Sequence, residues 1–307
     1  MKVLISGATG LIGRALCGSL SEQGHTVVAL SRSPETTRGL RAAELHKWDP
    51  QSGQFPTGAL AGVDAVVHLA GEPIIARRWS EEQKKRIRDS RVLTTRTLVE
   101  EFRSLDQRPA IFVCGSAVGF YGDRGDEQLV ETAPAGKGFL SEVCQEWESE
   151  AARASELGMR VVEVRTGVVL SADGGALPKM LAPFKLGLGG RLGSGKQWFP
   201  WIHIQDIVGI FSHAMLTSSL EGPVNGAAPE AATNAEFTGQ LARVLHRPAF
   251  LPVPELALRV LMGEMAEALL GSQRVVPAAA LASKYQFYYQ SLTPALEHLL
   301  GNAKPSA

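Results

Sequence analysis

The sequence predicts an α/β protein built on a doubly wound parallel sheet, followed by a smaller, mostly helical C-terminal domain. Three observations support this fold class. The first strand enters a glycine-rich turn and leaves it as a helix, and short apolar strands then alternate with helical patterns up to residue 165. Such alternation is typical of parallel sheets with right-handed crossovers. After residue 252 the pattern is helical, apart from a weak strand signal at 285–289.

The glycine-rich turn is the strongest single feature. From Val3 the chain reads VLISGATGLIG, and the helical pattern after it ends near Gly24. In this arrangement the first glycine permits a tight turn, the second lets a pyrophosphate approach the backbone, and the third lets the helix pack on the strand. The start of the helix also attracts anions. A bound nucleotide is therefore expected, the alternative being an empty glycine-rich turn. The expected contacts are Gly7, Thr9, Gly10, Leu11, Ile12 and Gly13.

The other elements follow from apolar runs and their end signals. Strands are expected at residues 27–31, 44–48, 65–70, 111–116 and 161–165, and long helices at 80–102 and 139–157. Residues 173–201 are rich in glycine and aromatics and are expected to form a loop. The expected domains are a cofactor-binding unit at 1–170, to which 201–230 return, and a substrate-side unit at 171–200 and 231–302.

Composition excludes several classes of protein. Lys plus Arg equals Asp plus Glu at 31 each, so no net charge recruits nucleic acid or an anionic membrane. The cysteines Cys17, Cys114 and Cys144 are far apart and lie in apolar patterns, which predicts reduced, buried thiols and no metal site. The first strand starts directly after Met1, without a signal-peptide pattern, so we expect a cytoplasmic protein.

The end of the second strand points to the kind of nucleotide. An acidic residue at this position usually binds the ribose of NAD, whereas NADP needs a positive charge for its 2′-phosphate. Residues 31–33 read SRS and contain no acid. Ser31 and Arg32 are therefore expected to bind the phosphate of NADP(H). A solvated surface arginine is the alternative.

Several motifs together resemble a known family. GATGLIG, AVVHLAG, GSAVGFYG and WIHIQD look like an extended short-chain dehydrogenase/reductase of the NAD(P)-dependent epimerase/dehydratase superfamily. GEPIIARRW, SRVLTTR and GLGGRLGSGKQWFPWIHIQD resemble its branch of epimerase family proteins, which has a C-terminal domain of its own. The resemblance covers essentially the whole chain. It implies a Rossmann domain and bound NADP(H), with Leu69, Ala70 and Gly71 against the cofactor. The oligomeric state stays open: superfamily members often form homodimers through the two long helices, which here are 80–102 and 139–157.

The chain departs from this family at the catalytic pair. Extended members carry Tyr-x-x-x-Lys, in which the tyrosine donates the proton and the lysine lowers its pKa. By spacing, the pair should fall near Leu140 and Cys144, and neither residue fits. Arg91 stands where extended members carry an asparagine. We expect it to reach the nicotinamide ribose or the pyrophosphate and to replace the lysine in part.

Replacement donors are sought at the carboxyl ends of the strands. Ser116 and Tyr121 are the catalytic candidates, although Ser116 could instead bond to its own turn. His203 could act as an acid or base near neutral pH, or join the two domains together with Asp206, which is the favoured reading. The expected substrate contacts are Glu72, Arg78, Trp79, Trp198, Trp201 and His203.

The function expected from these features is an NADP(H)-dependent oxidoreductase or epimerase-like enzyme acting on a small carbonyl or alcohol. Because the usual pair is missing, a non-catalytic NADPH-binding sensor is the competing hypothesis. A purely structural dimer partner is a third, but it leaves the glycine-rich turn and Arg32 unexplained.

Overall fold

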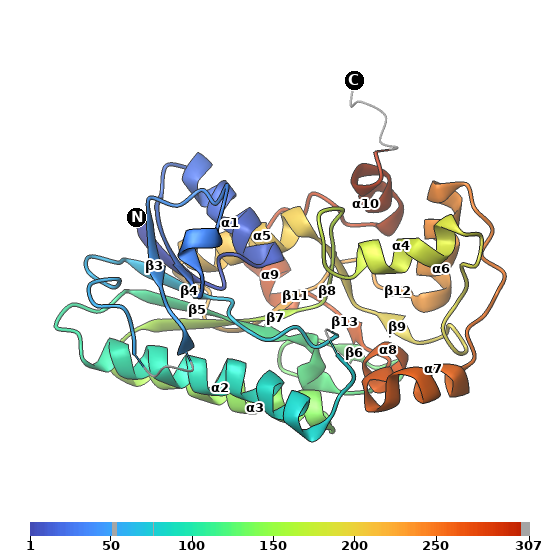
Figure 1. Cartoon of the computed structure of the whole chain (residues 1–307), viewed down its shortest axis with the longest axis horizontal. Coiled ribbons are helices and arrows are strands. Elements are labelled where there is room, and N and C mark those ends of the chain that lie inside the picture. Colours follow the sequence, from blue (N-terminus) through green and yellow to red (C-terminus); the bar gives the residue numbers. More distant parts are fainter. Residues whose placement is uncertain (51–53, 76, 302–307) are drawn as a thin grey trace.

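The computed structural model describes residues 1–50, 54–75 and 77–301, and a seven-stranded sheet forms its centre (Figure 1). The strands are β1 (Lys2–Ser6), β2 (Thr26–Ser31), β3 (Glu44–Lys47), β4 (Ala65–His68), β5 (Ile111–Ala117), β7 (Arg160–Thr166) and β11 (Gly222–Gly226). All run parallel, in the order β11-β7-β5-β4-β1-β2-β3. The chain moves outward from β1 to β3 and then returns on the other side of β1. The strand order therefore reverses between β1 and β4.

Helices cover both faces of this sheet. In Figure 1, α2 (Glu81–Arg103) and α3 (Phe139–Ala152) lie below it, and α1 (Leu11–Glu22) and α5 (Ile204–Leu216) lie above it. Strand side chains alternate between the faces. Val3 and Ile5 join the core under α1 and α5, whereas Leu4 joins the core over α2 and α3. Burial on both faces explains why the central strands are continuous apolar runs.

A third core holds the C-terminal region together, to the right of the sheet in Figure 1. Helices α4 (Leu177–Lys185), α6 (Asn234–Leu245) and α10 (Leu292–Leu299) contribute to this core. The region also contains α7 (Glu255–Met262) and α8 (Glu267–Leu270). Trp201, Phe237 and Leu241 lie at the centre of this core. Short strand pairs connect the region internally and to the sheet side. They are β8 (Val168–Leu170) with β10 (Trp201–His203), β9 (Trp198–Phe199) with β12 (Ala232–Thr233), and β6 (Gln128–Leu129) with β13 (Arg274–Val275). Helix α9 (Ala278–Ala282) follows β13.

The predicted fold class is confirmed, with local corrections. The strand expected at 65–70 ends at His68, residues 285–289 form no strand, and 173–201 contain helix α4 as well as loop. The helix expected at 139–157 ends in a 3-10 turn, Arg153–Leu157. Strand β11 escaped prediction because its sequence, GPVNG, is rich in weak strand formers. An edge strand tolerates proline, and β11 is at the edge.

No helix in the described part of the chain has the length and apolar character needed to cross a bilayer. No three side chains of His, Cys, Asp or Glu in that part gather around a point where a metal could bind.

A buried carboxylate joins the C-terminal segment to the sheet domain. Asp206, in the first turn of α5, is completely buried. Its two oxygens accept the backbone N–H groups of Tyr288 (2.7 Å) and Tyr289 (3.0 Å). The Tyr285 hydroxyl donates to the Asp206 carbonyl at 3.1 Å. The structural role that the sequence favoured for Asp206 is thus confirmed.

We expect Asp206→Ala to lower the free energy of unfolding by about 3 kcal/mol, because two buried N–H donors would lose their acceptor. Urea denaturation followed by circular dichroism measures the change. Asp106→Ala, at an exposed loop position, is the matched control and should leave stability within about 0.5 kcal/mol. Equal stability of the two variants would contradict the role of Asp206.

Candidate functional site

The glycine turn has the geometry that the sequence predicts. Gly7 has a φ of +68°, and a Cβ there would lie 2.5 Å from the backbone carbon of Leu69. A Cβ on Gly13 would lie 2.2 Å from the Gly7 carbonyl oxygen. The N-cap of α1 is Gly10, which has no side chain to satisfy the first N–H groups of the helix. Those groups are therefore available to an anion.

A second glycine pair covers the start of α1. A Cβ on Gly175 would lie 2.9 Å from a methyl carbon of Leu11, and one on Gly174 would lie 3.6 Å from the other methyl. The loop before α4 therefore lies against the first residue of α1. Sequence reasoning missed this contact, although the adjacent glycines were a signal that a backbone comes close to something.

Ser31 and Arg32 lie at the end of β2, as expected, but one side chain is buried and the other is exposed. Arg32 is exposed. Ser31 is buried, and its hydroxyl accepts the N–H of Ser33 at 3.2 Å. The Thr37 hydroxyl donates to the Ser33 carbonyl at 2.9 Å, so the Ser31 hydroxyl donates to Thr37 at 3.2 Å. The Ser31 proton is used within the turn, and direct donation by Ser31 to a phosphate is not supported.

Arg91 lies directly beneath the loop that follows β4. Its Nη1 donates to the carbonyl oxygens of Glu72 and Ile87, each at 3.0 Å. A Cβ on Gly71 would lie 3.2 Å from the guanidinium carbon, so a larger residue at position 71 would press on Arg91 and displace it slightly. The guanidinium also lies 5.3 Å from the centre of the Trp147 ring. Burial lowers the pKa of Arg91, but a guanidinium remains charged in proteins.

One of the two positions expected for the missing pair, Cys144, lies close enough to Arg91 to interact with its charge. A Cβ on Gly119 would be 3.2 Å from Cβ of Leu140 and 3.8 Å from Sγ of Cys144, which places both α3 residues against the loop after β5. Burial raises the pKa of Cys144 to about 12, and the positive charge of Arg91 opposes that shift. Cys144 is therefore a neutral, buried thiol, as the sequence predicts.

Ser116 and Tyr121, the predicted catalytic residues, are bound to other partners, although Ser116 also lies beside Cys144. The Ser116 hydroxyl donates to Oε1 of Glu148 at 2.6 Å. Tyr121 is completely buried; its hydroxyl donates to Oδ1 of Asn225 at 2.7 Å and accepts from Nη1 of Arg165 at 3.0 Å. Burial raises the pKa of Tyr121, which makes it a weaker acid. Both hydroxyls belong to a structural network, and we do not assign them a catalytic role.

A buried ion pair forms the centre of that network. Arg165 donates from Nε and Nη2 to the two oxygens of Glu148, at 2.9 and 2.8 Å. Its guanidinium carbon lies 3.5 Å from the centre of the Phe120 ring. The sequence offered no signal for this pair, because Arg165 is on strand β7 and Glu148 is on helix α3. The two residues meet only when the helix packs on the sheet.

The predicted substrate residues divide into two groups. Glu72, Arg78, Trp79 and Trp198 are exposed or partly buried. Trp79 donates to the Ile74 carbonyl at 2.8 Å and packs edge-on against Phe139. The Trp198 indole donates to Asp126 at 2.9 Å. Arg78 lies 3.0 Å from the Cβ position of Gly263, where the C-terminal region meets the loop before α2.

Trp201 and His203 are corrections, because both are buried in the core. The Trp201 indole donates to the Glu230 carbonyl at 3.1 Å. Nδ1 of His203 accepts the Gln205 N–H at 3.0 Å, so the ring proton is on Nε2 and points to His298 at 3.2 Å. Burial lowers the pKa of His203 to about 3. His203 is a neutral structural residue, in line with the favoured reading of the sequence, and not an acid or base.

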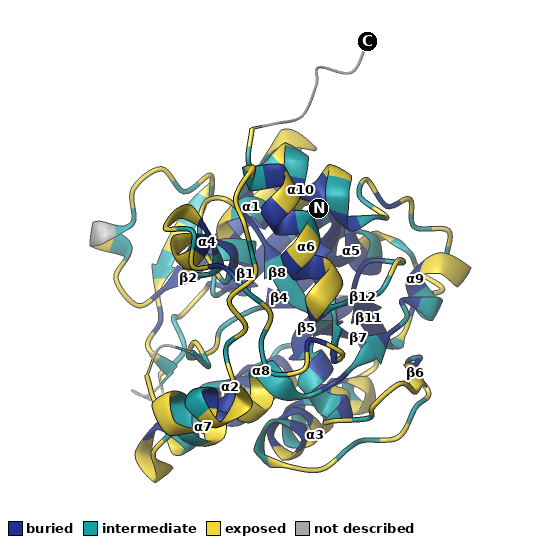
Figure 2. Cartoon of the chain, turned by 90° about the vertical axis from the view of Figure 1, so that its right-hand side faces the viewer, coloured by how far each residue is buried: buried dark blue, intermediate teal, exposed yellow. Residues whose placement is uncertain are grey.

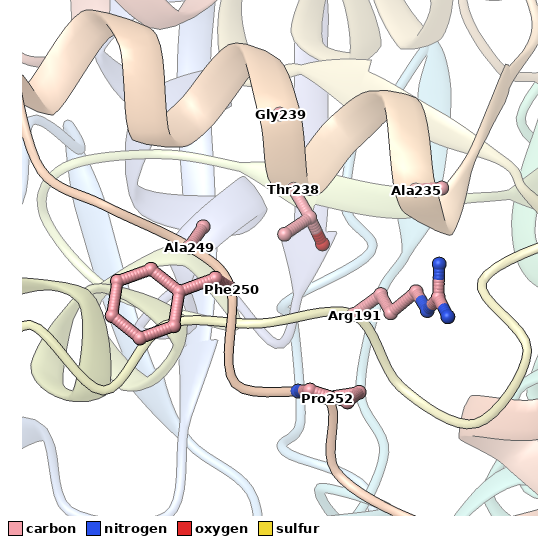
Figure 3. A pocket seen from close by; sticks show the side chains of 7 residues that line it. All are labelled: Arg191, Ala235, Thr238, Gly239, Ala249, Phe250 and Pro252. Atoms are coloured by element: carbon pink, nitrogen blue, oxygen red, sulfur yellow. The ribbon is translucent and has the colours of Figure 1, made fainter.

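Two hollows lie away from the glycine turn. One, of about 320 Å³, is lined by Arg191, Ala235, Thr238, Gly239, Ala249, Phe250 and Pro252 (Figure 3). The other, of about 390 Å³, lies where α2 and α3 begin and is lined by Glu81, Lys84, Lys85, Arg88, Phe139 and Glu142. Neither includes a residue predicted to bind a cofactor.

Family models match most of the chain. Residues 3–225 match the NAD dependent epimerase/dehydratase family, and residues 253–299 match a domain of unknown function, DUF1731. The epimerase family protein Mb2239 of Mycobacterium bovis is 42% identical over 295 residues, covering 96% of both chains. The epimerase family protein SDR39U1 of Homo sapiens is 40% identical over 304 residues, covering 98% of this chain and 100% of that one.

Solved structures agree with these matches. The crystal structure of human SDR39U1 (isoform 2) with NADPH has a TM-score of 0.87 and 38% identity, covering 99% of this chain and 100% of that one. A UDP-glucuronic acid 4-epimerase from Bacillus cereus has a TM-score of 0.77 at 18% identity, covering 98% of both chains. At that identity the likeness shows the fold alone.

Glu163, on β7 near the Arg165–Glu148 pair, gives stability a dependence on pH. Burial and the Glu148 charge raise the pKa of Glu163 from 4.5 to about 7. Between pH 4.5 and about pH 7, Glu163 is protonated in the folded protein but ionised in the unfolded chain. The free energy of unfolding therefore falls as the pH rises through this range. Glu163→Gln removes the ionisation. We expect the free energy of unfolding of Glu163→Gln, relative to that of wild type, to rise by on the order of 3 kcal/mol between pH 4.5 and pH 8.

Urea denaturation at several pH values measures this difference. Glu156→Gln, at a side chain that is 66% exposed, is the control and should show no such trend. A constant difference between Glu163→Gln and wild type across the range would contradict the prediction.

Proposed function

This chain belongs to the NAD-dependent epimerase/dehydratase family, and we propose that it is an NADP(H)-dependent oxidoreductase or epimerase-like enzyme. Its substrate would be a small carbonyl or alcohol. The observation that carries the proposal is the glycine turn, where two would-be Cβ atoms clash with backbone and the first N–H groups of α1 have no side-chain cap. The human relative, at 38% identity, has been crystallised with NADPH.

The residues present fit a dinucleotide with a 2′-phosphate. The start of α1 would hold the pyrophosphate. Leu69, Ala70 and Gly71 would border the cofactor at the point where the strand order reverses, because the backbone of Leu69 and Ala70 lies against Gly7. Arg32 is exposed directly after β2, and residues 31–33 contain no acid. Its guanidinium would pair with the 2′-phosphate by charge-assisted hydrogen bonds.

When bound, the cofactor supplies hydride chemistry, and the chain supplies orientation and charge. Arg91 would place a fixed positive charge at the loop after β4, where it would stabilise negative charge on a ribose, a pyrophosphate or a reacting oxygen. Leu140 cannot donate a proton, and Cys144, with a pKa of about 12, is a poor donor near neutral pH. Glu72, which directly follows Gly71, is the carboxyl group nearest in sequence to the loop after β4.

A non-catalytic NADPH sensor is the second candidate. It is favoured by the lack of an identified proton donor among these residues. The two positions of the missing pair hold Leu140 and Cys144, and the hydroxyls of Ser116 and Tyr121 are used within the structural network. Binding without turnover would fit that arrangement.

We expect Arg32→Ala to raise the Kd for NADPH at least tenfold and to leave the Kd for NADH nearly unchanged, because only NADPH carries the 2′-phosphate. Titration of the nicotinamide fluorescence measures both constants. Arg41→Ala, whose guanidinium pairs with Glu22, is the control and should bind NADPH like wild type. Full NADPH affinity in Arg32→Ala would exclude the assignment.

The enzyme proposal is tested by NADPH oxidation with a panel of aldehydes, ketones, quinones and keto acids. We expect at least one acceptor to be reduced. Arg91→Ala should weaken NADPH binding at least tenfold, about 1.4 kcal/mol, and slow the reaction. Arg88→Ala, on the same helix and paired with Glu146, should do neither.

Two glycine variants separate loss of binding from loss of chemistry. In Gly13→Ala the new methyl would meet the Gly7 carbonyl, so binding should be lost; in Gly18→Ala nothing lies within 4 Å, so binding should persist. Tight binding by wild type with no turnover across the panel would favour the sensor. No binding at all would overturn both candidates.

A further inference from the structure

The hollow of about 320 Å³ lies on the C-terminal region, beside helix α6 (Figure 3). Its walls come from α6, from residues 249–252 and from Arg191 in the loop after α4. Figure 2 shows α6 on the face turned to the viewer, with both exposed and buried positions along it. Pockets for small ligands begin at about 300 Å³, so this hollow suits a single ring and not a dinucleotide. We refer to it as the α6 hollow.

Backbone hydrogen bonds hold the walls of the α6 hollow together. The Ala235 N–H donates to the Gly195 carbonyl at 2.8 Å, which joins the loop after α4 to the first turn of α6. The Val253 N–H donates to the Arg191 carbonyl at 2.9 Å, which joins the same loop to the segment before α7. The fold therefore positions the walls without a ligand, as is usual for small-molecule sites.

Thr238 carries a buried hydroxyl that points into the α6 hollow (Figure 3). The residue is 6% exposed, and its hydroxyl has no hydrogen-bond partner in the part of the chain that the structure describes. Helical threonines can donate to the carbonyl four residues earlier, as Thr95 does to Arg91 at 2.7 Å and Thr97 to Leu93 at 3.0 Å. A polar group as buried as Thr238 is usually hydrogen-bonded. Its direction therefore indicates a hydroxyl placed to bind a ligand.

Arg191 brings a positive charge to the opposite side of the hollow from Phe250 (Figure 3). Its guanidinium has no ion-pair partner among the described residues. A Cβ on Gly195 would lie 2.9 Å from Cδ of Arg191, so the stem of the side chain packs on its own loop. Residues 177–200 contain four basic side chains and no acidic one. A planar guanidinium in such surroundings favours a carboxylate, which it can bind through two hydrogen bonds.

The acids on the two helices beside the hollow do not cancel this charge. Helix α6 has one acid, Glu236, whose carboxylate is used in the capping box with Thr233. Helix α7 has one acid, Glu255, which pairs with Arg259 at 2.8 Å. The α6 hollow therefore keeps a positive potential, which attracts an anion.

The shape of the hollow favours a flat ligand. Phe250, at 72% exposure, presents its ring as one wall. The lining on α6 is small, because Ala235 and Gly239 lie one turn apart on the same face as Thr238. A Cβ on Gly239 would meet nothing within 4 Å, so packing does not require glycine there, although glycine weakens a helix. An aromatic ring can lie in this space against Phe250.

We propose that the α6 hollow binds a small aromatic carboxylate. The carboxylate pairs with the Arg191 guanidinium, the ring packs against Phe250, and the Thr238 hydroxyl hydrogen-bonds a polar group of the ligand. None of these residues is assigned to NADP(H), so the proposal is independent of the proposed function.

Saturation-transfer NMR titration of the full chain with 2-hydroxybenzoate, in the absence of NADPH, tests the proposal. We expect saturable binding with a Kd below about 1 mM. The neutral 2-hydroxybenzamide should bind at least tenfold more weakly, because it cannot form the ion pair. Arg191→Gln should raise the Kd for 2-hydroxybenzoate at least tenfold. Arg243→Gln, exposed on α6 but outside the lining, is the matched control and should bind like wild type.

Two further variants separate binding from structure. Thr238→Val should raise the Kd about fivefold without lowering the melting temperature, because the hydroxyl contributes to the ligand and not to the fold. Gly239→Leu should abolish binding by filling the hollow. Gly18→Leu on α1, another helical glycine with nothing within 4 Å of its Cβ position, is its control and should bind 2-hydroxybenzoate normally. Circular dichroism checks that each variant is folded.

Four results would each overturn the proposal. They are the lack of saturable binding, equal binding of the amide, an unchanged Kd in both Arg191→Gln and Gly239→Leu, and displacement of 2-hydroxybenzoate by NADPH. The last would assign the ligand to the dinucleotide site. Because the titrations contain no NADPH and measure no turnover, their outcome does not depend on whether the chain is an enzyme or a sensor.

Discussion

The close approach of the Gly7 and Leu69 backbones is the contact on which the rest of the site depends. With a Cβ at Gly7 only 2.5 Å from the Leu69 carbon, and one at Gly13 only 2.2 Å from the Gly7 oxygen, no other residue type allows this packing. The contact fixes the start of α1 relative to the loop after β4. Arg91, which is held under that loop by the Glu72 carbonyl, takes its position from the same contact.

Most acid–base side chains near the sheet's carboxyl edge serve the structure. Arg165 neutralises Glu148, Tyr121 bonds to Asn225, and Asp206 accepts the backbone of the C-terminal segment. A buried polar group without partners is destabilising, so each of these groups is committed to a neighbour. The groups named here are therefore not free to act as proton donors. At the loop after β4 the chain places a guanidinium whose charge does not depend on pH.

The sequence predicted what local patterns encode and missed what tertiary packing decides. Apolar runs located six strands of the sheet, and glycine spacing located the turn at Gly7. Strand β11 was missed because its glycines and proline hide the strand signal. Trp201 and His203 were placed at the substrate because aromatic and imidazole side chains suit both a pocket and a core. Burial alone distinguishes these two cases, and burial depends on α6 and α10, which are distant in sequence.

The choice between enzyme and sensor depends on what the reacting group needs from the protein. A reaction that produces an alkoxide needs a proton donor beside the reacting oxygen, whereas one that produces a stabilised anion needs only a nearby positive charge. Arg91 can supply that charge, and Cys144, as a neutral thiol, does not compete for it. The position of Arg91 beneath Gly71 therefore gives the enzyme proposal a physical basis even though the Tyr-x-x-x-Lys pair is missing. It also narrows the proposal to chemistry in which the protein stabilises charge and solvent supplies the proton.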